Sequence, residues 1–438
     1  QDHVANTMTA PYYRFDGSND EIAIADNAHM SFGDGTSDSP FSISAWINME
    51  EATGFPIVNK GTYNSDSEWW FEVSEDGSDK LGLYLFDESV ASTYELAAVT
   101  TAVTAYEGKW IHVCGTYNGV GGTSANAGIT IYINGVSQAL TLGGGGTYVA
   151  MESLADEVRI GNYNDTNFAQ GSIAGLKIYN LELSATEVKE LYSGASVPFK
   201  YKGANQTNLI IGGALDDQNG TFETGGSDGD DVSTGTDWVK SNTAAELDNE
   251  AGSGVNTYNG STFCAKIHTA TGNYPSIALS GANFESQLTI GKRYRVSFDY
   301  KVGGTQGSAG SYARLTTGSV TTNLTLASTS WTSVSMESDP IPATASAELR
   351  FYSEVGTSED GDEILWIDNV SVVPIGAVAE YDGSGVGASR WDDKSGNELH
   401  GTVSGATVEN APADADSGLT YEEGTWTPVY EAASGNNF

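Results

Sequence analysis

The chain has 438 residues, which is too long for one compact core, so two or three domains are expected. It carries 58 Asp and Glu against 19 Lys and Arg, for a formal net charge of -39. Such a charge repels phosphate backbones and anionic lipid, which argues against nucleic acid or membrane insertion as a partner. No stretch reaches the roughly 20 apolar residues of a membrane span, and the first residues lack the basic and apolar regions of a signal peptide.

The first block of the chain reads as a series of strands. Short alternating runs of Val, Ile, Tyr, Phe and Thr stand between Gly, Asn, Asp and Ser clusters, which is typical of β-sandwiches and barrels. Asn134-Gly135 suits a tight turn with positive φ. Trp46 and Trp110 are predicted to pack the sandwich rather than to contact a sugar. The clearest runs are 41–47, 110–117 and 129–133.

One helix is expected in this block, beginning at Ser184. Glu187 follows three positions later and completes a capping box, in which the hydroxyl and the carboxylate each satisfy a free backbone amide. Gly194 is predicted to end the helix. Apolar residues stand between them at helical spacing, at Val188, Leu191 and Tyr192.

A second β-rich block follows a polar linker. In the run Tyr294–Tyr300, aromatic and aliphatic residues alternate with polar ones, so one face is predicted to be core and the other to be wet. After Pro374 the chain becomes rich in Gly, Ser, Asp and Asn. The expected fold class is all-β, with two tandem antiparallel β-sandwich (jelly-roll) domains and a short irregular C-terminal extension. The predicted segments are 1–10, a sandwich over 11–196, a linker over 197–208, a sandwich over 209–374, a Gly/Ser/Asp-rich segment over 375–412 and a tail over 413–438.

The two cysteines, Cys114 and Cys264, lie in different predicted domains. A structural disulfide between them is therefore not expected, and both are predicted to be buried thiols.

Six stretches of the first block stand in the order found in the concanavalin A-like lectin/glucanase superfamily. They resemble its laminin G-like and pentraxin-like modules, which implies a sandwich and a binding function. In such modules calcium often sits at one rim, and the resemblance places Asn162, Asn164, Asp165 and Gln170 where some of its ligands would be, with Asn164 and Asp165 as the predicted ligands. Solvated polar loops are the alternative. The six stretches are 12–24, 41–48, 57–61, 110–119, 129–136 and 158–192.

The second block resembles the carbohydrate-binding jelly rolls of families four, nine and twenty-two. The resemblance rests on NGTFETG at 219–225, GKRYRVSFDYKV at 291–302 and EILWIDNVSVVP at 363–374. It implies a structural calcium that joins the first strand to the last, with Glu223 and Asp368 as ligands. Two solvated or backbone-paired acids are the alternative.

Sugar recognition in the second block would need an aromatic platform and polar partners for hydroxyl groups. Flanking Gly and Ser residues favour Tyr274 and Tyr312 as the most exposed aromatic candidates, with Asp299 as a further polar partner. Packing in the core or rim is the alternative for each ring. The candidate carbohydrate-binding residues are Trp238, Tyr258, Tyr274, Tyr312, Tyr352 and Arg314.

The end of the chain resembles stretches of tail-fibre and other structural proteins of tailed bacteriophages. The resemblance covers 378–412 and the sequence YEEGTWTPVYE at 421–431. It implies a homotrimeric fibre at the virion surface, in contact with other virion proteins.

No catalytic centre is expected. Retaining glycosidases need two carboxylates about 5 to 5.5 Å apart, and Glu68 and Glu72 are too far apart along one strand, so solvated acids are the preferred interpretation. The acidic run 359–363 is interrupted by Gly and is predicted to lie in a loop. The five histidines are scattered, and His112 is predicted to be an ordinary strand residue.

These observations favour a non-catalytic virion structural and adhesion protein, a tail or capsid fibre that binds host-surface glycans. The alternative is a secreted polysaccharide-binding protein of the bacterial cell surface, or an accessory fragment of a glycoside hydrolase. Calcium is the expected cofactor.

Overall fold

The computed structural model divides the chain into two compact units. Unit 1 combines Gln1–Ala195 with Ala377–Phe438, and unit 2 spans Ser196–Gly376. The residues described are 8, 10–62, 66–74, 77–90, 93–163, 167–193, 203–204, 206–210, 212–213, 216–217, 221–222, 228–233, 238–241, 243–248, 263–269, 275–280, 282–303, 310–342, 347–353, 364–410, 419–422 and 425–428.

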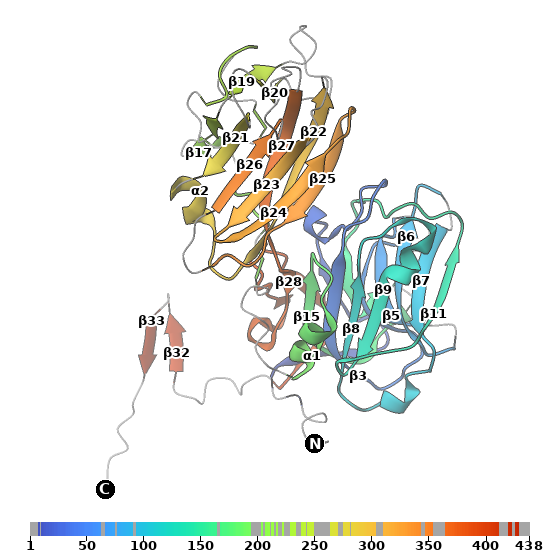
Figure 1. The fold of residues 1–438 in the computed structure, drawn as a ribbon. Helices are drawn as coiled ribbons and strands as arrows, with labels where there is room; N and C mark the ends of the chain where they lie inside the picture. The colour runs from blue at the N-terminus through green and yellow to red at the C-terminus, as the bar shows by residue number, and fades with distance from the viewer. Residues whose placement is uncertain are drawn as a thin grey trace. The chain divides into compact units, whose positions relative to one another are not determined.

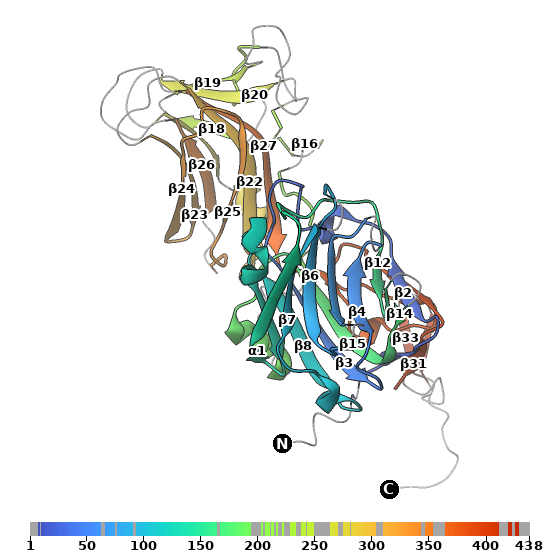
Figure 2. The ribbon, with the colours of Figure 1, turned by 90° about the vertical axis from the view of Figure 1, so that its right-hand side faces the viewer.

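Unit 1 is a sandwich of two antiparallel sheets (Figures 1 and 2). In its described residues, the first sheet has the order β10-β9-β8-β3-β15-β1-β31, with β28 also paired to β15. These strands are β1 (Tyr12–Asp16), β3 (Phe41–Met49), β8 (Ile111–Tyr117), β9 (Ile129–Ile133), β10 (Val136–Ser137), β15 (Gln170–Tyr179), β28 (Ala377–Glu380) and β31 (Thr407–Glu409).

The second sheet of unit 1 has the order β11-β7-β6-β5-β4-β12-β2-β30-β29 among the described residues. Its strands are β2 (Glu21–Ile24), β4 (Phe55–Lys60), β5 (Trp69–Val73), β6 (Leu81–Asp87), β7 (Thr93–Val99), β11 (Leu140–Gly145), β12 (Val158–Ile160), β29 (Arg390–Trp391) and β30 (Gly401–Ser404). A short hairpin of β13 (Asn162–Tyr163) and β14 (Asn167–Phe168) stands beside it.

The core of unit 1 follows from strand alternation. In β3 the alternate residues Phe41, Ile43, Ala45 and Ile47 are all buried, as predicted. Trp110 is buried against Tyr12 but lies outside the main core cluster, and Trp46 is half-buried on the face of β3 that points away from the core. Trp46 packs there against His112 and Tyr192.

The predicted helix is confirmed as α1 (Ala185–Ser193). The backbone N–H of Ser184 donates to Glu187 Oε2 at 2.9 Å, and the N–H of Glu187 donates to Ser184 Oγ at 3.4 Å, which is the expected capping box. Val188 is the buried residue of the helix, so α1 packs on the sandwich through a narrow apolar contact.

The segment after Pro374 corrects one prediction. Residues 375–412 were expected to form a separate irregular segment, yet β28, β29, β30 and β31 join the two sheets of unit 1. β31 pairs with β1, and β30 pairs with β2, so the chain returns to the strands where it began. Tyr381 and Trp391 are fully buried in the core of unit 1, which explains why so polar a segment is ordered.

Unit 2 is a second antiparallel sandwich, in which the described residues form two five-stranded sheets around one core. One sheet contains β18 (Trp238–Ser241), β21 (Ser276–Ser280), β26 (Ala347–Tyr352), β23 (Ser311–Thr317) and β24 (Val320–Leu326), in that order. The other contains β19 (Thr243–Asp248), β20 (Cys264–Thr269), β27 (Ile364–Ile375), β22 (Arg293–Gly303) and β25 (Thr332–Glu337), in that order.

Smaller elements complete the described chain. They are the helix α2 (Ala282–Gln287), the hairpins β16 (Gly212–Gly213) with β17 (Asp216–Asp217) and β32 (Leu419–Glu422) with β33 (Thr425–Pro428), and 3-10 turns at Ala28–Met30 (η1), Thr104–Tyr106 (η2), Gly122–Gly128 (η3) and Gly383–Gly385 (η5).

The all-β sandwich prediction is confirmed, and the run Tyr294–Tyr300 buries its apolar face in β22 as expected. Cys114 and Cys264 are both buried and are not joined by a disulfide, in agreement with the sequence analysis. Within the described ranges, no helix has the length and apolar character needed to cross a membrane.

Trp391 tests whether the C-terminal strands are integral to unit 1. Its ring has no exposed surface and packs 5.1 Å from Tyr13 and 5.3 Å from Tyr381. Trp391→Ala is expected to lower the free energy of unfolding by about 3–5 kcal/mol, the usual cost of removing a buried Trp side chain.

Urea denaturation measures this cost, and Val136→Ala, at a residue with 63% exposure, is the control and should change stability by less than about 0.5 kcal/mol. A Trp391→Ala variant as stable as that control would show that the segment is merely appended.

Candidate functional site

The outer face of one sheet in unit 2 gathers aromatic and charged side chains. In β23, Ala313 and Leu315 point into the core, so Tyr312 and Arg314 stand on the outer face. The same alternation operates in β26, where Leu349 and Phe351 are core residues. Its outward residues are Glu348, Arg350 and Tyr352.

The register of these strands places the outward residues in direct pairs. Tyr312 lies opposite Tyr352, and Arg314 lies opposite Arg350. The two tyrosine rings stack with their centroids 4.4 Å apart and an interplanar angle of 13°. Arg314 Cζ lies 4.9 Å from the centre of the Tyr352 ring, and Arg350 Cζ lies 5.8 Å from it, so two guanidinium groups and two rings form one packed layer.

Glu348 links the two arginines. It accepts hydrogen bonds from Arg350 Nε at 2.9 Å and Nη2 at 2.7 Å, and from Arg314 Nη2 at 3.3 Å. The hydrogen bond from Arg350 is the main cause that holds the pKa of Glu348 below its usual value. Arg350 Nη1 also donates to Ser276 Oγ on β21 at 3.0 Å, so the group is fixed from three strands.

We call Tyr312, Arg314, Glu348, Arg350 and Tyr352 the Tyr-Arg face. Tyr352 is 6% exposed and forms the base, whereas the side chains of Arg314 and Glu348 keep 31% and 24% exposure. On the neighbouring strand β24, the exposed Asn323 and Thr325 lie opposite Arg314 and Tyr312. Rings beside fixed guanidinium, carboxylate, amide and hydroxyl groups suit a ligand with both apolar C–H surface and many hydroxyls.

The structure brings together three of the predicted carbohydrate-binding residues, namely Tyr312, Tyr352 and Arg314. Trp238 is a correction, because its side chain is buried in the core of unit 2 against Phe222 and Phe351. Asp299 is also buried, on the other sheet, where it accepts a hydrogen bond from Asn369 Nδ2. The predicted residues Tyr258 and Tyr274 lie outside the described residues.

Sequence reasoning missed Arg350 and Glu348. The signal was present, because Glu348, Arg350 and Tyr352 alternate with apolar residues in the stretch AELRFY. The pairing of this stretch with β23, which gives the alternation its meaning, is not visible in the sequence.

Unit 1 holds a polar cavity of about 310 Å³ on its surface. Glu51 and Thr53 from the β3–β4 loop and Phe168 from β14 contribute to its wall, together with Gln170 at the start of β15. Gln170 is one of the positions where the resemblance implies calcium ligands, whereas Asn164 and Asp165 lie outside the described residues. The other lining residues are Gly17, Gly54 and Asn167.

The predicted calcium pair of unit 2 is half described. Asp368 is fully buried in β27, and its Oδ1 accepts a hydrogen bond from the backbone N–H of Asn369 at 2.8 Å. Glu223 lies outside the described residues. In the described part of the chain, no group of three or more His, Cys, Asp or Glu side chains could hold a metal ion, so calcium stays a prediction.

Glu68 and Glu72 correct the expectation of solvated acids, because their exposures are 0% and 8%. Glu68 forms an ion pair with Lys60 at 3.3 Å and accepts a hydrogen bond from the N–H of Leu154 at 2.8 Å. Four positions along an extended chain span about 13 Å, more than a pair of glycosidase carboxylates requires. The acidic run 359–363 lies outside the described residues.

His112 and Cys114 share one face of β8, but their surroundings do not favour a catalytic pair. Burial, followed by the nearby charge of Lys177, lowers the pKa of His112 to about 3. Burial raises the pKa of the Cys114 thiol well above its usual value. Both side chains are therefore neutral near pH 7, whereas a reactive cysteine needs its thiolate form. His112 Nε2 lies 2.9 Å from Ser44 Oγ, as suits a packed strand residue.

Comparison with known proteins bears on unit 1. The family model of the concanavalin A-like lectin/glucanases superfamily matches residues 16–189. Unit 1 carries a concanavalin A-like lectin/glucanase domain. This confirms the superfamily expected from the six stretches of the first block, whereas the bacteriophage origin stays a prediction. No curated protein matches the chain.

Several solved structures are similar to parts of the chain. A heptameric SAP-like pentraxin from Limulus polyphemus shows 17% identity over 42% of this chain and 82% of its own, with a TM-score of 0.30. The CBM22-1 xylan-binding domain from Paenibacillus barcinonensis shows 14% identity over 40% of this chain and 99% of its own, with a TM-score of 0.26. Domain 4 of an extracellular arabinanase from Geobacillus stearothermophilus was solved with arabinotriose. It shows 19% identity over 43% of this chain and 98% of its own, with a TM-score of 0.27. At these values the likenesses carry no argument about ligands.

Glu68 predicts a pH dependence of stability. Burial raises its pKa from 4.5 to about 7, although the charge of Lys60 opposes the rise. Between pH 4.5 and pH 7 the folded chain holds the proton of Glu68 more tightly than the unfolded chain does. The free energy of unfolding that this proton contributes is complete below pH 4.5 and is lost as the pH rises toward 7. Glu68→Gln should remove this slope.

Urea unfolding midpoints across this pH range measure the effect. Glu72→Gln keeps Glu68 and serves as the control that should retain the slope. A slope that is the same in wild type and Glu68→Gln would contradict the assignment.

Proposed function

We propose that the chain is a non-catalytic glycan-binding protein and that the Tyr-Arg face of unit 2 contacts the sugar. The observation that carries this proposal is the convergence of Tyr312, Arg314 and Glu348 on one half-exposed sheet face. The concanavalin A-like lectin/glucanase domain of unit 1 supports the same class of ligand.

The fixed geometry of the face favours binding over chemistry. The carboxylate of Glu348 is engaged by both arginines, which keeps it ionised and oriented as an acceptor for sugar hydroxyls. An acid catalyst would need a raised pKa, whereas the pKa of Glu348 is lowered. The group therefore suits recognition of hydroxyls by charged hydrogen-bond partners.

The biological setting is a second part of the proposal. The resemblance of 378–412 and 421–431 to phage structural proteins supports a tail or capsid fibre that attaches to host-surface glycans. A polysaccharide-binding protein of the bacterial surface, or an accessory part of a glycoside hydrolase, is equally compatible with the two sandwiches. Detection of the chain by mass spectrometry in purified virions would support the fibre, and its absence there would favour the alternative.

Calcium at Glu223 and Asp368, calcium at Asn164 and Asp165, and a trimeric assembly with other virion proteins belong to this proposal as well. Calcium removal by a chelator would test the first two, and mass measurement in solution would test the third.

Replacement of the face should abolish glycan binding. Tyr312→Ala and Arg314→Ala are each expected to weaken binding at least about tenfold, which corresponds to ~1.4 kcal/mol, for a polysaccharide that retards the wild-type chain in affinity electrophoresis. The polysaccharide is first identified by affinity electrophoresis on a panel of neutral and acidic glycans, and Kd is then measured by calorimetry.

Trp366 supplies a matched control on the other sheet of unit 2. Lys301 Nζ lies 5.0 Å from the centre of its ring, and Trp366 Nε1 donates to Asp248 Oδ2, so it also is a surface ring with charged partners. Trp366→Ala should leave Kd unchanged. If Trp366→Ala weakened binding while both face variants retained it, the Tyr-Arg face would be the wrong site.

A further inference from the structure

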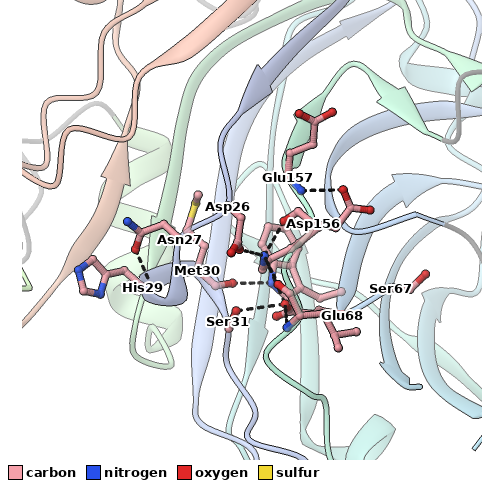
Figure 3. Close-up of polar contacts among 12 residues, drawn as sticks. Asp26, Asn27, His29, Met30, Ser31, Ser67, Glu68, Asp156 and Glu157 are labelled. Carbon is pink, nitrogen blue, oxygen red and sulfur yellow. Dashed lines mark hydrogen bonds and ion pairs between the residues drawn. The ribbon is translucent and has the colours of Figure 1, made fainter. Parts of the chain in front are cut away.

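Lys60 lies at the end of β4 with no exposed side-chain surface. Its Nζ donates to Asp26 Oδ1 at 2.7 Å, to the carbonyl of Asp156 at 2.8 Å and to the carbonyl of Leu154 at 3.2 Å. Glu68 Oε1 lies 3.3 Å from the same nitrogen. Figure 3 shows Asp26, Glu68 and Asp156 meeting from separate segments. We call these four oxygens and the ammonium the Lys60 cage.

The donor set of the cage is that of a hard metal ion. Two carboxylate and two carbonyl oxygens surround one charge, and Ca²⁺ prefers such oxygens at about 2.3–2.6 Å, with waters completing its shell. An ammonium has only three protons for the four oxygens. Glu68 Oε2, which is not one of the four cage oxygens, is buried and has no hydrogen-bond partner within the described residues.

The cage ties three loops together. Asp26 follows β2, Glu68 precedes β5, and Asp156 lies in the segment before β12. Two further bonds secure the first loop, because Trp69 Nε1 donates to the carbonyl of Met30 at 2.9 Å and Ser31 Oγ donates to Glu68 Oε1 at 3.1 Å. Removal of the central charge would therefore leave two carboxylates facing each other and loosen all three loops.

We propose that the Lys60 cage is a calcium-type cation site whose cation is supplied by the chain itself. The tethered ammonium holds the loops in the absence of metal, and a chain without it accepts a divalent cation in its place. This site is distinct from the calcium sites predicted at Asn164 and Asp165 and at Glu223 and Asp368.

An ordinary buried ion pair would not behave in this way, and unit 1 contains one for comparison. Lys177 Nζ lies 2.9 Å from Glu380 Oε1, and Glu380 is almost fully buried, but the described contacts of this lysine include one carboxylate and no carbonyl cage. Lys177→Ala is therefore the matched control for Lys60→Ala.

The experiment compares full-length wild type, Lys60→Ala and Lys177→Ala by thermal unfolding, with a chelator or with millimolar CaCl₂. Terbium luminescence reports directly on the site, because Trp69 adjoins Glu68 and can sensitise a bound lanthanide. Calcium is expected to raise the Tm of Lys60→Ala by several degrees more than it raises that of the other two proteins. Sensitised terbium emission should rise in Lys60→Ala above the level of both controls.

If Lys60→Ala does not fold in the chelator, it should refold from urea when calcium is present. The proposal is overturned if calcium raises the Tm of Lys60→Ala no more than that of wild type, or if it raises the Tm of Lys177→Ala as much. It is also overturned if Lys60→Ala fails to refold both with the chelator and with calcium.

Discussion

Side chains on a β-strand alternate between the two faces of its sheet, and this constraint positions everything else in the protein. In each sandwich one face of a strand is committed to the core, so the residues between the core positions must face outward. Ala313 and Leu315 in β23 thereby set the direction of Tyr312 and Arg314. A shift of one residue in register would bury the arginine and expose the core, which makes the arrangement of the face as robust as the core itself.

This acidic chain has few cationic side chains, and two of them, Lys60 and Arg314, stand beside several partners in the structure. The chain has 19 Lys and Arg for 58 Asp and Glu. Lys60 is fully buried and surrounded by oxygens, so solvent and salt screen it little. Arg314 is partly exposed, so its charge is available to a ligand but is screened. One cation thus serves the architecture of unit 1, and the other serves the proposed recognition by unit 2.

Local patterns in the sequence were sufficient for the main strands before Pro374 and for α1. The alternation around Phe41 and the capping box of Ser184 with Glu187 depend on neighbouring residues, so they can be read without knowledge of the fold. Two rings and one charge of the candidate site, Tyr312, Tyr352 and Arg314, were recognised for the same reason. The wrong prediction for Trp238 has a physical cause as well. An aromatic residue in a strand can pack in the core or can form a flat surface for a sugar, and the local sequence is the same in both cases.

The features that the sequence did not reveal all depend on contacts between distant segments. β31 pairs with β1 across almost the whole chain, and its polar sequence gives no sign of that partner. Glu68 was expected to be solvated, because its partners Lys60 and the N–H of Leu154 are brought to it only by the fold. Likewise, Arg350 gains its role through the register with β23. Long-range pairing decided these cases, and no local pattern encodes it.

Hydrogen exchange with and without a retained polysaccharide tests the central claim most directly, because it maps contact without any substitution. The account predicts added protection of backbone amides in 311–317 and 347–352, with 293–303 and 364–375 on the opposite sheet unchanged. Protection confined to unit 1, with β23 and β26 unaffected, would contradict it.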